Sequence, residues 1–193
     1  MDIYTEIDRP FVRETLKARL LQGHVVILPT DTIYGISGNA LDEKVVRRIL
    51  EIKGRESPFS IIPHSLDWAR LLIADSHRSL FDSHIHGYTG PYTTLWPYSG
   101  RLAHLVEPLR SSGLVGLRLP DHWITELASE AGVPLITTSV NVHQRPYMTF
   151  LDDLEESIRL GADLIVYEGP LCGPPSTIVH CHEGLPFRIE ERG

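Results

Sequence analysis

The sequence lacks the long apolar runs and the leader pattern that mark membrane and exported proteins. No stretch of the 193 residues approaches the roughly 18 consecutive apolar residues that a membrane-spanning helix needs. The first ten residues, MDIYTEIDRP, have neither the basic start nor the apolar segment of a signal peptide. We therefore expect a cytoplasmic protein.

Cysteine is also scarce, with Cys172 and Cys181 as the two thiols of the chain. Two cysteines in a reducing compartment are most simply free, and a disulfide or metal role is the alternative. Histidine is more frequent, and His180 and His182 would face the same side of a strand. Because no second pair of ligands has the spacing of a zinc site, we predict no metal site.

Basic residues are fewer than acidic ones. The chain has 18 Lys and Arg residues against 25 Asp and Glu residues, a formal net charge of −7. A large, sequence-independent grip on nucleic acid needs a basic face, so this balance argues against one. An anionic ligand would have to be held locally, by a few cations and backbone N–H groups.

Several motifs of nucleotide-binding and covalent enzymes are missing. The sequence contains neither G-x-x-x-x-G-K-S/T nor G-x-G-x-x-G, which argues against a P-loop or Rossmann nucleotide site. No carboxylate pair, Cys/His dyad or Ser/His/Asp set is evident. These absences leave a site that works by binding and positioning rather than through a covalent nucleophile.

The order of the predicted elements indicates one α/β domain over residues 1–193, a length that suits a single core. Apolar periodicity predicts helices over 8–23, 42–53, near 66–73, 121–131 and 151–161. Strands are predicted over 24–28, 59–62, 92–96, 114–119, 134–139, 163–167, 176–180 and 186–190, and the rest of 76–100 is predicted to be irregular. Without strict βαβ alternation, we expect a mixed, curved sheet with helices packed outside it.

The helix predicted over 42–53 has the clearest ends. Asp42 and Glu43 stand at its start, where the helix dipole favours acidic side chains, and Gly54 can end it. Lys53 and Arg55 therefore lie where helix gives way to loop, and we expect both to point away from the core face. Replacing either with alanine should then have little effect on the fold.

Polar side chains gather at the ends of four predicted elements. They are Thr30, Asp31, Thr32 and Tyr34 in one loop, Lys53 and Arg55, then Thr138, Ser139 and Asn141, and finally Ser176 and Thr177. Each group also has a simpler explanation on its own. The side chains of a turn can hydrogen-bond to the backbone of that turn, and cations at the end of a helix can interact with its dipole while exposed to solvent. Open α/β sheets bind ligands at strand ends, and taken together these groups predict a polyphosphate or carboxylate site.

The sequence resembles the YrdC family, the threonylcarbamoyl-adenylate synthases. LPTDTIYGIS (28–37) matches the signature P-T-D/E-T-x-Y-G-L/I of that family. Five more landmarks follow in the family's order: KGR (53–55), GPYTTLW (90–96), LRLPDH (117–122), TTSVN (137–141) and PPSTIV (174–179). The resemblance covers roughly residues 9–193.

This resemblance implies a fold and a reaction. The fold is a YrdC-like twisted mixed sheet with surrounding helices and a concave, positively charged cleft. In the reaction, L-threonine, bicarbonate and ATP, with Mg²⁺, yield threonylcarbamoyl-AMP and pyrophosphate. The tRNA threonylcarbamoyl-transfer proteins, as partners, then modify adenosine 37 of tRNA.

It also implies roles for residues that match the family's motifs. Lys53, Arg55, Ser139, Asn141 and Arg192 would bind ATP, with Arg188 as a lesser candidate than Arg192. Thr32, Arg118, Ser176, Thr30 and Tyr34 would bind or surround the threonine, Arg118 pairing with its carboxylate.

Two alternatives stay open at this stage. RESPFS (55–60) is shorter than the family's usual segment and lacks its proline and second lysine, which favours a same-fold enzyme acting on a different amino-acid or carbamoyl adenylate. The other alternative is a YrdC-like RNA-binding or accessory module without synthase activity, which the net charge disfavours.

Overall fold

The computed structural model describes residues 1–5, 10–54, 59–101, 113–142 and 145–192. Its strands are β1 (Asp2–Tyr4), β2 (Val26–Leu28), β3 (Gly35–Asn39), β4 (Ser60–Ile62), β5 (Tyr92–Pro97), β6 (Leu114–Arg118), β7 (Leu135–Ser139), β8 (Leu164–Val166), β9 (Thr177–His180) and β10 (Arg188–Glu190). Its α-helices are α1 (Pro10–Leu21), α2 (Glu43–Lys53), α3 (Leu66–Leu72), α4 (Arg78–His84), α5 (Trp123–Ala131) and α6 (Glu156–Gly161).

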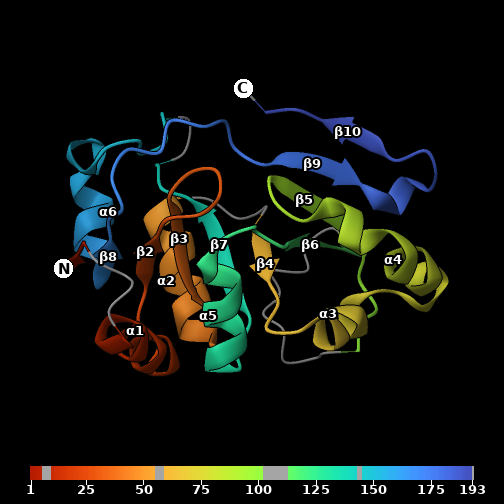
Figure 1. Cartoon of the computed structure of the whole chain (residues 1–193), viewed down its shortest axis with the longest axis horizontal. Helices are drawn as coiled ribbons and strands as arrows, with labels where there is room; N and C mark the ends of the chain where they lie inside the picture. The colour runs from red at the N-terminus through yellow and green to blue at the C-terminus, as the bar shows by residue number, and fades with distance from the viewer. Residues whose placement is uncertain (6–9, 55–58, 102–112, 143–144, 193) are drawn as a thin grey trace.

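The described strands form one sheet, in the order β1-β8-β2-β3-β7-β4-β6-β5-β9-β10 (Figure 1). Its directions are mixed: β3 pairs antiparallel with β7, whereas β4 pairs parallel with β6 and β5 parallel with β9. The predicted mixed α/β sheet is therefore confirmed, and β1 is a strand that the sequence analysis missed.

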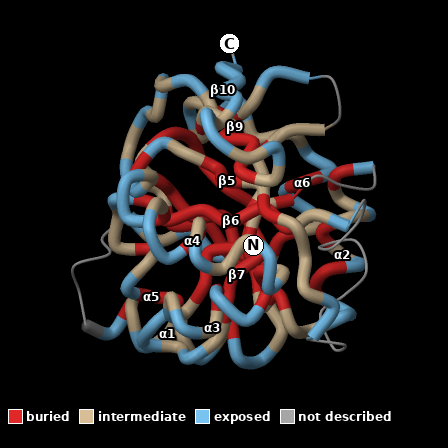
Figure 2. Tube along the Cα trace, turned by 90° about the vertical axis from the view of Figure 1, so that its right-hand side faces the viewer, coloured by how far each residue is buried: buried red, intermediate tan, exposed pale blue. Residues whose placement is uncertain are grey.

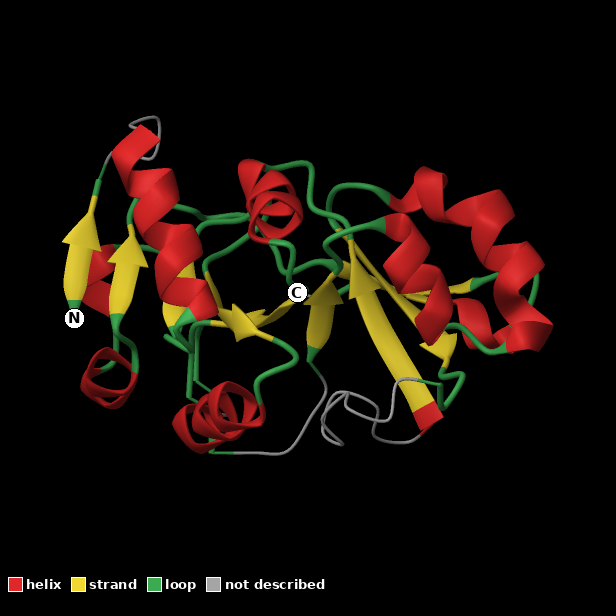
Figure 3. Cartoon of the chain, turned by 90° about the horizontal axis from the view of Figure 1, so that it is seen from below, coloured by secondary structure: helices red, strands yellow, loops and turns green. Residues whose placement is uncertain are grey.

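Helices cover both faces of this sheet (Figure 3). Val26 and Leu28 of β2 belong to an apolar cluster with Leu16 of α1 and Leu127 of α5, whereas Ile27 belongs to the cluster that contains α2. Side chains alternate between faces along a strand, so β2 is buried on both sides. Figure 2 shows the buried residues concentrated along the central strands.

The helix over 42–53 forms where the sequence predicts it. The Asp42 side chain accepts hydrogen bonds from the backbone N–H groups of Lys44 and Val45, and this caps the start of α2. Gly54 ends the helix with φ at 62°, a left-handed conformation that glycine adopts without steric cost. The prediction for this helix is confirmed.

Other predictions for the helices need adjustment. The helix predicted over 8–23 is observed over 10–21, and its proposed cap, Asp8, lies outside the described residues. The helix predicted over 151–161 is divided into a 3₁₀ turn, Leu151–Asp153, and α6.

The segment predicted to be irregular is mostly helical before β5. A 3₁₀ turn (Asp75–His77), α4 and a second 3₁₀ turn (Ile85–Tyr88) follow one another. Phe81 and Ile85 lie four residues apart and are both buried, with the Phe81 ring edge-on to Trp96 at 5.4 Å between centroids. The prediction was wrong because the many polar residues here masked this short apolar stripe.

No helix in the described ranges combines the length and the apolar composition needed to cross a bilayer.

Candidate functional site

A cavity of about 580 Å³ collects residues from seven strands, β3 to β7, β9 and β10. Six of the predicted site residues line it: Tyr34, Arg118, Ser139, Asn141, Ser176 and Arg192. These residues come from parts of the chain far apart in sequence. The structure therefore brings most of the predicted site into one place.

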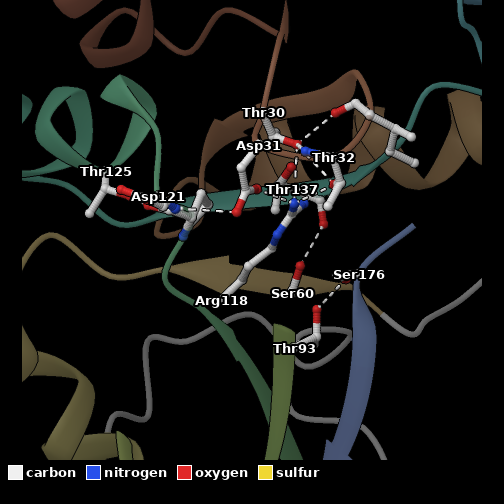
Figure 4. A network of polar contacts seen from close by, with 12 residues as sticks. Thr30, Asp31, Thr32, Ser60, Thr93, Arg118, Asp121, Thr125, Thr137 and Ser176 are labelled. Carbon is white, nitrogen blue, oxygen red and sulfur yellow. Dashed lines mark hydrogen bonds and ion pairs between the residues drawn. The ribbon is translucent and has the colours of Figure 1, made fainter. Parts of the chain in front are cut away.

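One side of the cavity is formed by Arg118 and the loop before β3; we call Arg118, Thr30, Asp31 and Thr32 the arginine corner (Figure 4). Arg118 Nη2 lies 2.6 Å from Asp31 Oδ1, 3.1 Å from Thr30 Oγ1 and 2.5 Å from Thr32 Oγ1. The Arg118 and Asp31 side chains are only 7% and 10% exposed. A nearly buried guanidinium is thus paired with a nearly buried carboxylate.

Burial and charge act on Arg118 in opposite directions. Burial lowers the pKa of the guanidinium, because it disfavours the charged form, and the Asp31 carboxylate raises it. The Nε atom of Arg118 is also buried, and the described residues give it no hydrogen-bond partner. The guanidinium of Arg118 is therefore a charged group at the cavity with one N–H, that of Nε, still able to donate a hydrogen bond.

The two threonines of the arginine corner also close their own turn. Thr30 Oγ1 donates to the Ile33 carbonyl at 2.7 Å and accepts from the Thr32 N–H at 3.2 Å. Both side chains are buried, and neither is among the described residues that line the cavity. In this structure they support Arg118 from behind. Their hydrogen bonds to the loop backbone also agree with the simpler explanation, in which turn side chains bond to the backbone of their own turn.

Tyr34 joins this loop to the segment after β8. Its hydroxyl donates to the Gly169 carbonyl at 2.7 Å and accepts from the Glu168 N–H at 3.0 Å. Burial raises the pKa of Tyr34 to about 12. Tyr34 is one of the cavity-lining residues, and its hydroxyl holds backbone groups.

Another part of the cavity wall is formed by Ser139 and Asn141, and together with Lys53 behind them we call these residues the lysine corner. Lys53 Nζ lies 2.7 Å from the Ser139 carbonyl oxygen, 2.6 Å from the Asn141 carbonyl oxygen and 2.5 Å from Asn141 Oδ1. Ser139 Oγ is 3.4 Å from the same ammonium, and it donates to Asn141 Oδ1 at 2.6 Å. The three residues form one bonded unit.

Lys53 itself is fully buried, so the expectation that it points away from the core face is wrong. The ammonium at the end of its long stem reaches past the end of α2 to the oxygens that follow β7. Ser139 and Asn141 line the cavity, whereas Lys53 lies behind them. Arg55, its expected companion, lies outside the described residues.

Arg192 enters the cavity next to Ser176. Its Nε donates to the Ser176 carbonyl at 2.8 Å, and its Nη2 donates to Ser176 Oγ at 2.7 Å. Ser176 Oγ in turn lies 2.7 Å from Thr93 Oγ1. Arg192, expected on the nucleotide, and Ser176, expected on the amino acid, are therefore in direct contact.

Sequence reasoning missed several hydroxyl residues of the cavity. Ser60, Thr93 and Thr137 line it, and the Ser60 hydroxyl donates to the Thr137 carbonyl at 3.4 Å. Thr93 belongs to the GPYTTLW segment, but nothing in that segment distinguishes Thr93 from Thr94. Only the pairing of β5 with its neighbours shows which threonine faces the cavity.

A group near the end of β9 has the composition of a metal site. The ligand atoms of His180, His182 and Glu183 lie within 4.8 Å of one another. Arg188, however, donates to His180 Nδ1 at 2.8 Å and to Glu183 Oε1 at 2.9 Å. Because a cation is already bonded to two of the three side chains, we do not assign a metal to them. Arg188, the lesser nucleotide candidate, is not among the described cavity-lining residues.

The prediction of two free cysteines is confirmed. Cys172 is exposed and Cys181 is buried, and both are free thiols. Burial raises the pKa of the Cys181 thiol to about 12, so it stays protonated near neutral pH. This thiol therefore has the character of a packed core residue and not of a reactive group.

The chain is similar to known proteins over nearly its whole length. A protein of Methanocaldococcus jannaschii is 31% identical over 191 residues, which cover 96% of this chain and 88% of that protein. The threonylcarbamoyl-AMP synthase of Bacillus subtilis is 29% identical over 91% of this chain and 52% of its own length. The crystal structure of Pyrococcus abyssi Sua5 complexed with L-threonine superposes with a TM-score of 0.79 at 25% identity, over 97% of this chain and 56% of that one.

The chain thus spans about half the length of the Bacillus and Pyrococcus proteins and most of the Methanocaldococcus protein. The family model of the Sua5, YciO and YrdC proteins, which carries the description "Telomere recombination", matches residues 18–193. This match agrees with the motifs read from the sequence, and the chain belongs to the Sua5/YciO/YrdC family.

Proposed function

We propose that this chain is an L-threonylcarbamoyladenylate synthase, which makes threonylcarbamoyl-AMP and pyrophosphate from L-threonine, bicarbonate and ATP. One observation carries the proposal: Arg118, Ser139, Asn141, Ser176 and Arg192 line a single cavity. The Bacillus relative bears the name of this activity, and the Pyrococcus relative is described in complex with L-threonine.

The proposed reaction makes and breaks few bonds. The amine of threonine adds to the carbon of bicarbonate with loss of water, which gives a carbamate. A carboxylate oxygen of that carbamate then attacks the α-phosphorus of ATP, and pyrophosphate leaves with the electrons of the broken P–O bond. Two anions must approach each other, so cations and N–H groups around them supply most of the catalysis.

The proposed residue roles follow the two corners. Arg118 pairs with the threonine carboxylate, Ser176 lies beside the amino acid, and Thr30, Thr32 and Tyr34 hold that wall. Ser139, Asn141 and Arg192 contact the nucleotide, together with Arg55. Lys53 acts in the ATP site by holding the turn of Ser139 and Asn141, to which its ammonium is bonded. The positive charge of the cleft stays a prediction.

The cavity offers little to a metal ion held by the protein alone. Among the described lining residues Glu190 is the one carboxylate, and its Oε2 already lies 2.9 Å from His180 Nε2 and 3.3 Å from Arg188 Nη1. This donor set does not fit a dedicated Mg²⁺ site. We propose that Mg²⁺ enters bound to the phosphates of ATP, as is common for this ion.

The proposed product is a reactive carrier of the threonylcarbamoyl group. We propose that it passes to the tRNA threonylcarbamoyl-transfer proteins, which place the group on adenosine 37 of tRNA. Direct RNA binding by this chain is not proposed, because the net charge of −7 disfavours it.

The direct test is release of pyrophosphate by the purified chain. We expect release when L-threonine, bicarbonate, ATP and Mg²⁺ are all present, and loss of release when any one is omitted. Arg118→Gln should abolish threonine-dependent release, whereas Arg47→Gln, on the exposed face of α2, should not. Release that is indifferent to threonine, or faster with another amino acid, would refute the substrate assignment.

A further inference from the structure

Thr93 lies between the two residues expected to hold the amino acid. In the sheet it is the direct antiparallel partner of Arg118 on β6. On its other side β5 pairs with β9, where Tyr92 is opposite Thr177, the residue after Ser176. Side chains of directly opposite residues share a face and lie about 5 Å apart at Cβ. Thr93, which lines the cavity, therefore lies on the same face of the sheet as Arg118.

A hydrogen-bonded chain runs from this threonine to the C-terminal arginine. Thr93 Oγ1 lies 2.7 Å from Ser176 Oγ, and Arg192 Nη2 donates to the same Ser176 oxygen at 2.7 Å (Figure 4 shows the Thr93–Ser176 contact). Thr93 and Ser176 are 8% and 3% exposed. A buried hydroxyl pair stays bonded because neither member can turn to bulk water.

Counting the hydrogens and lone pairs of the Ser176 hydroxyl shows which of its directions the two neighbours fix. A serine hydroxyl has one hydrogen and two lone pairs, and Arg192 takes one lone pair because a guanidinium only donates. Thr93 takes either the hydrogen or the second lone pair, so one bonding group of Ser176 is left over. With both neighbours in place, the direction of that remaining group is set before any ligand arrives.

We propose that Thr93 is a positioning residue for the amino-acid substrate: its hydroxyl orients the Ser176 hydroxyl within the cavity beside Arg118. This inference rests on the proposed function, in which Ser176 and Arg118 face the amino acid. Without the Thr93 hydroxyl, Arg192 still holds Ser176 Oγ, but the Ser176 O–H can rotate about its Cβ–Oγ bond and must be ordered when the substrate binds.

The neighbouring residue provides a matched control. Thr94 is also buried and also on β5, but it faces the other side of the sheet and its hydroxyl donates to the Leu117 carbonyl at 3.2 Å. Thr93→Val and Thr94→Val each remove one hydroxyl and preserve side-chain shape. Thr93→Ser keeps the hydroxyl and removes only a methyl group.

The experiment measures KM for L-threonine, KM for ATP and kcat in these variants, with thermal melting as a check of folding. For Thr93→Val we expect KM for L-threonine to rise about tenfold, with kcat and KM for ATP within about twofold. Thr94→Val should change none of the three, and Thr93→Ser should restore KM for L-threonine. Should Thr93→Val fail to fold, Thr93→Ala is expected to show the same rise.

Three results would overturn the proposal: an unchanged KM for L-threonine in Thr93→Val, an equal rise in Thr94→Val, or a parallel rise of KM for ATP. Failure of the proposed function is seen separately, in the wild-type chain, as an absence of threonine-dependent pyrophosphate release. In that case calorimetric titration of L-threonine into wild type and Thr93→Val replaces the kinetic measurement. Wild-type protein that binds no L-threonine would overturn both proposals.

Discussion

The lysine corner and the arginine corner are built in different ways around a buried cation. The Lys53 ammonium donates to neutral oxygens of one short turn, those of Ser139 and Asn141. Arg118 is held by a carboxylate, Asp31, and by two threonine hydroxyls of a loop. Arg118 lines the cavity, whereas Lys53 lies behind the residues that do.

This difference shows two uses of positive charge in one site. The lysine organises its neighbours, since its N–H groups are directed at their carbonyl and amide oxygens and hold the turn in shape. The arginine is itself organised, since Asp31 and the threonines fix a planar group that remains part of the cavity surface. Changes in the lysine corner should therefore act first on stability, and changes in the arginine corner more on ligand affinity.

The largest effect is expected from Lys53→Met. Methionine fills the stem of the lysine but removes the ammonium that donates to the Ser139 and Asn141 carbonyl oxygens and to Asn141 Oδ1. We expect a loss of about 3 kcal/mol in the free energy of unfolding, a fall of about 6–12 °C in Tm, and loss of pyrophosphate release.

Lys44→Met is the matched control, because Lys44 is exposed on the same helix. Urea unfolding of both variants tests the prediction. Equal stabilities for the two would mean that the oxygens around Lys53 find other partners, and that the lysine corner is not held together by its ammonium.

A smaller loss of stability and a clear loss of affinity are expected from Asp31→Asn. The amide keeps the shape of the side chain but removes the charge opposite Arg118. We expect the free energy of unfolding to fall by about 2 kcal/mol and KM for L-threonine to rise more than KM for ATP. Asp152→Asn, on an exposed residue, is the control. An unchanged KM for L-threonine would show that Asp31 does not position Arg118.

The smallest effect concerns pH and His122, which lies beside the arginine corner. Burial lowers the pKa of His122 below its ordinary value of 6.5, Glu168 and Asp31 oppose this, and Arg118 adds to it. Between the two pKa values the unfolded chain binds more protons than the folded chain. The neutral His122 ring therefore contributes its full share to the free energy of unfolding above pH 6.5, and this contribution decreases as the pH falls below 6.5.

His122→Gln removes this titration, so its stability should decrease less than that of the wild type between about pH 7.5 and pH 5. Urea unfolding across this range measures the difference, and His86→Gln, on an exposed ring, is the control. A wild-type curve parallel to that of His122→Gln would show that the ring is protonated equally in the folded and unfolded chains.

Much of the local structure was predictable because its signals lie close together in the sequence. The ends of α2 follow from Asp42 and Gly54, and the buried strand β2 follows from its run of β-branched and apolar residues. The LPTDTIYGIS motif likewise located the loop that supports Arg118. These features depend on contacts within a few residues.

The site itself depends on contacts between distant residues. Lys53 meets Ser139 and Asn141 across 86 and 88 positions, and Arg118 meets Asp31 across 87. The burial of Lys53 was missed for this reason, since a lysine at a helix end is ordinarily solvated. The choice of Thr93 over Thr94 as the cavity residue also depends on strand register.

By itself, then, the sequence determined the kind of fold, the places of most helices and strands, and the residue types available for binding two anions. Tertiary structure decided which cations line the cavity and which one lies behind it, and which threonine pairs with Arg118 in the sheet and bonds to Ser176. The physical reason is that propensity and capping act over one or two turns, whereas desolvation and charge pairing are determined only when distant segments pack together.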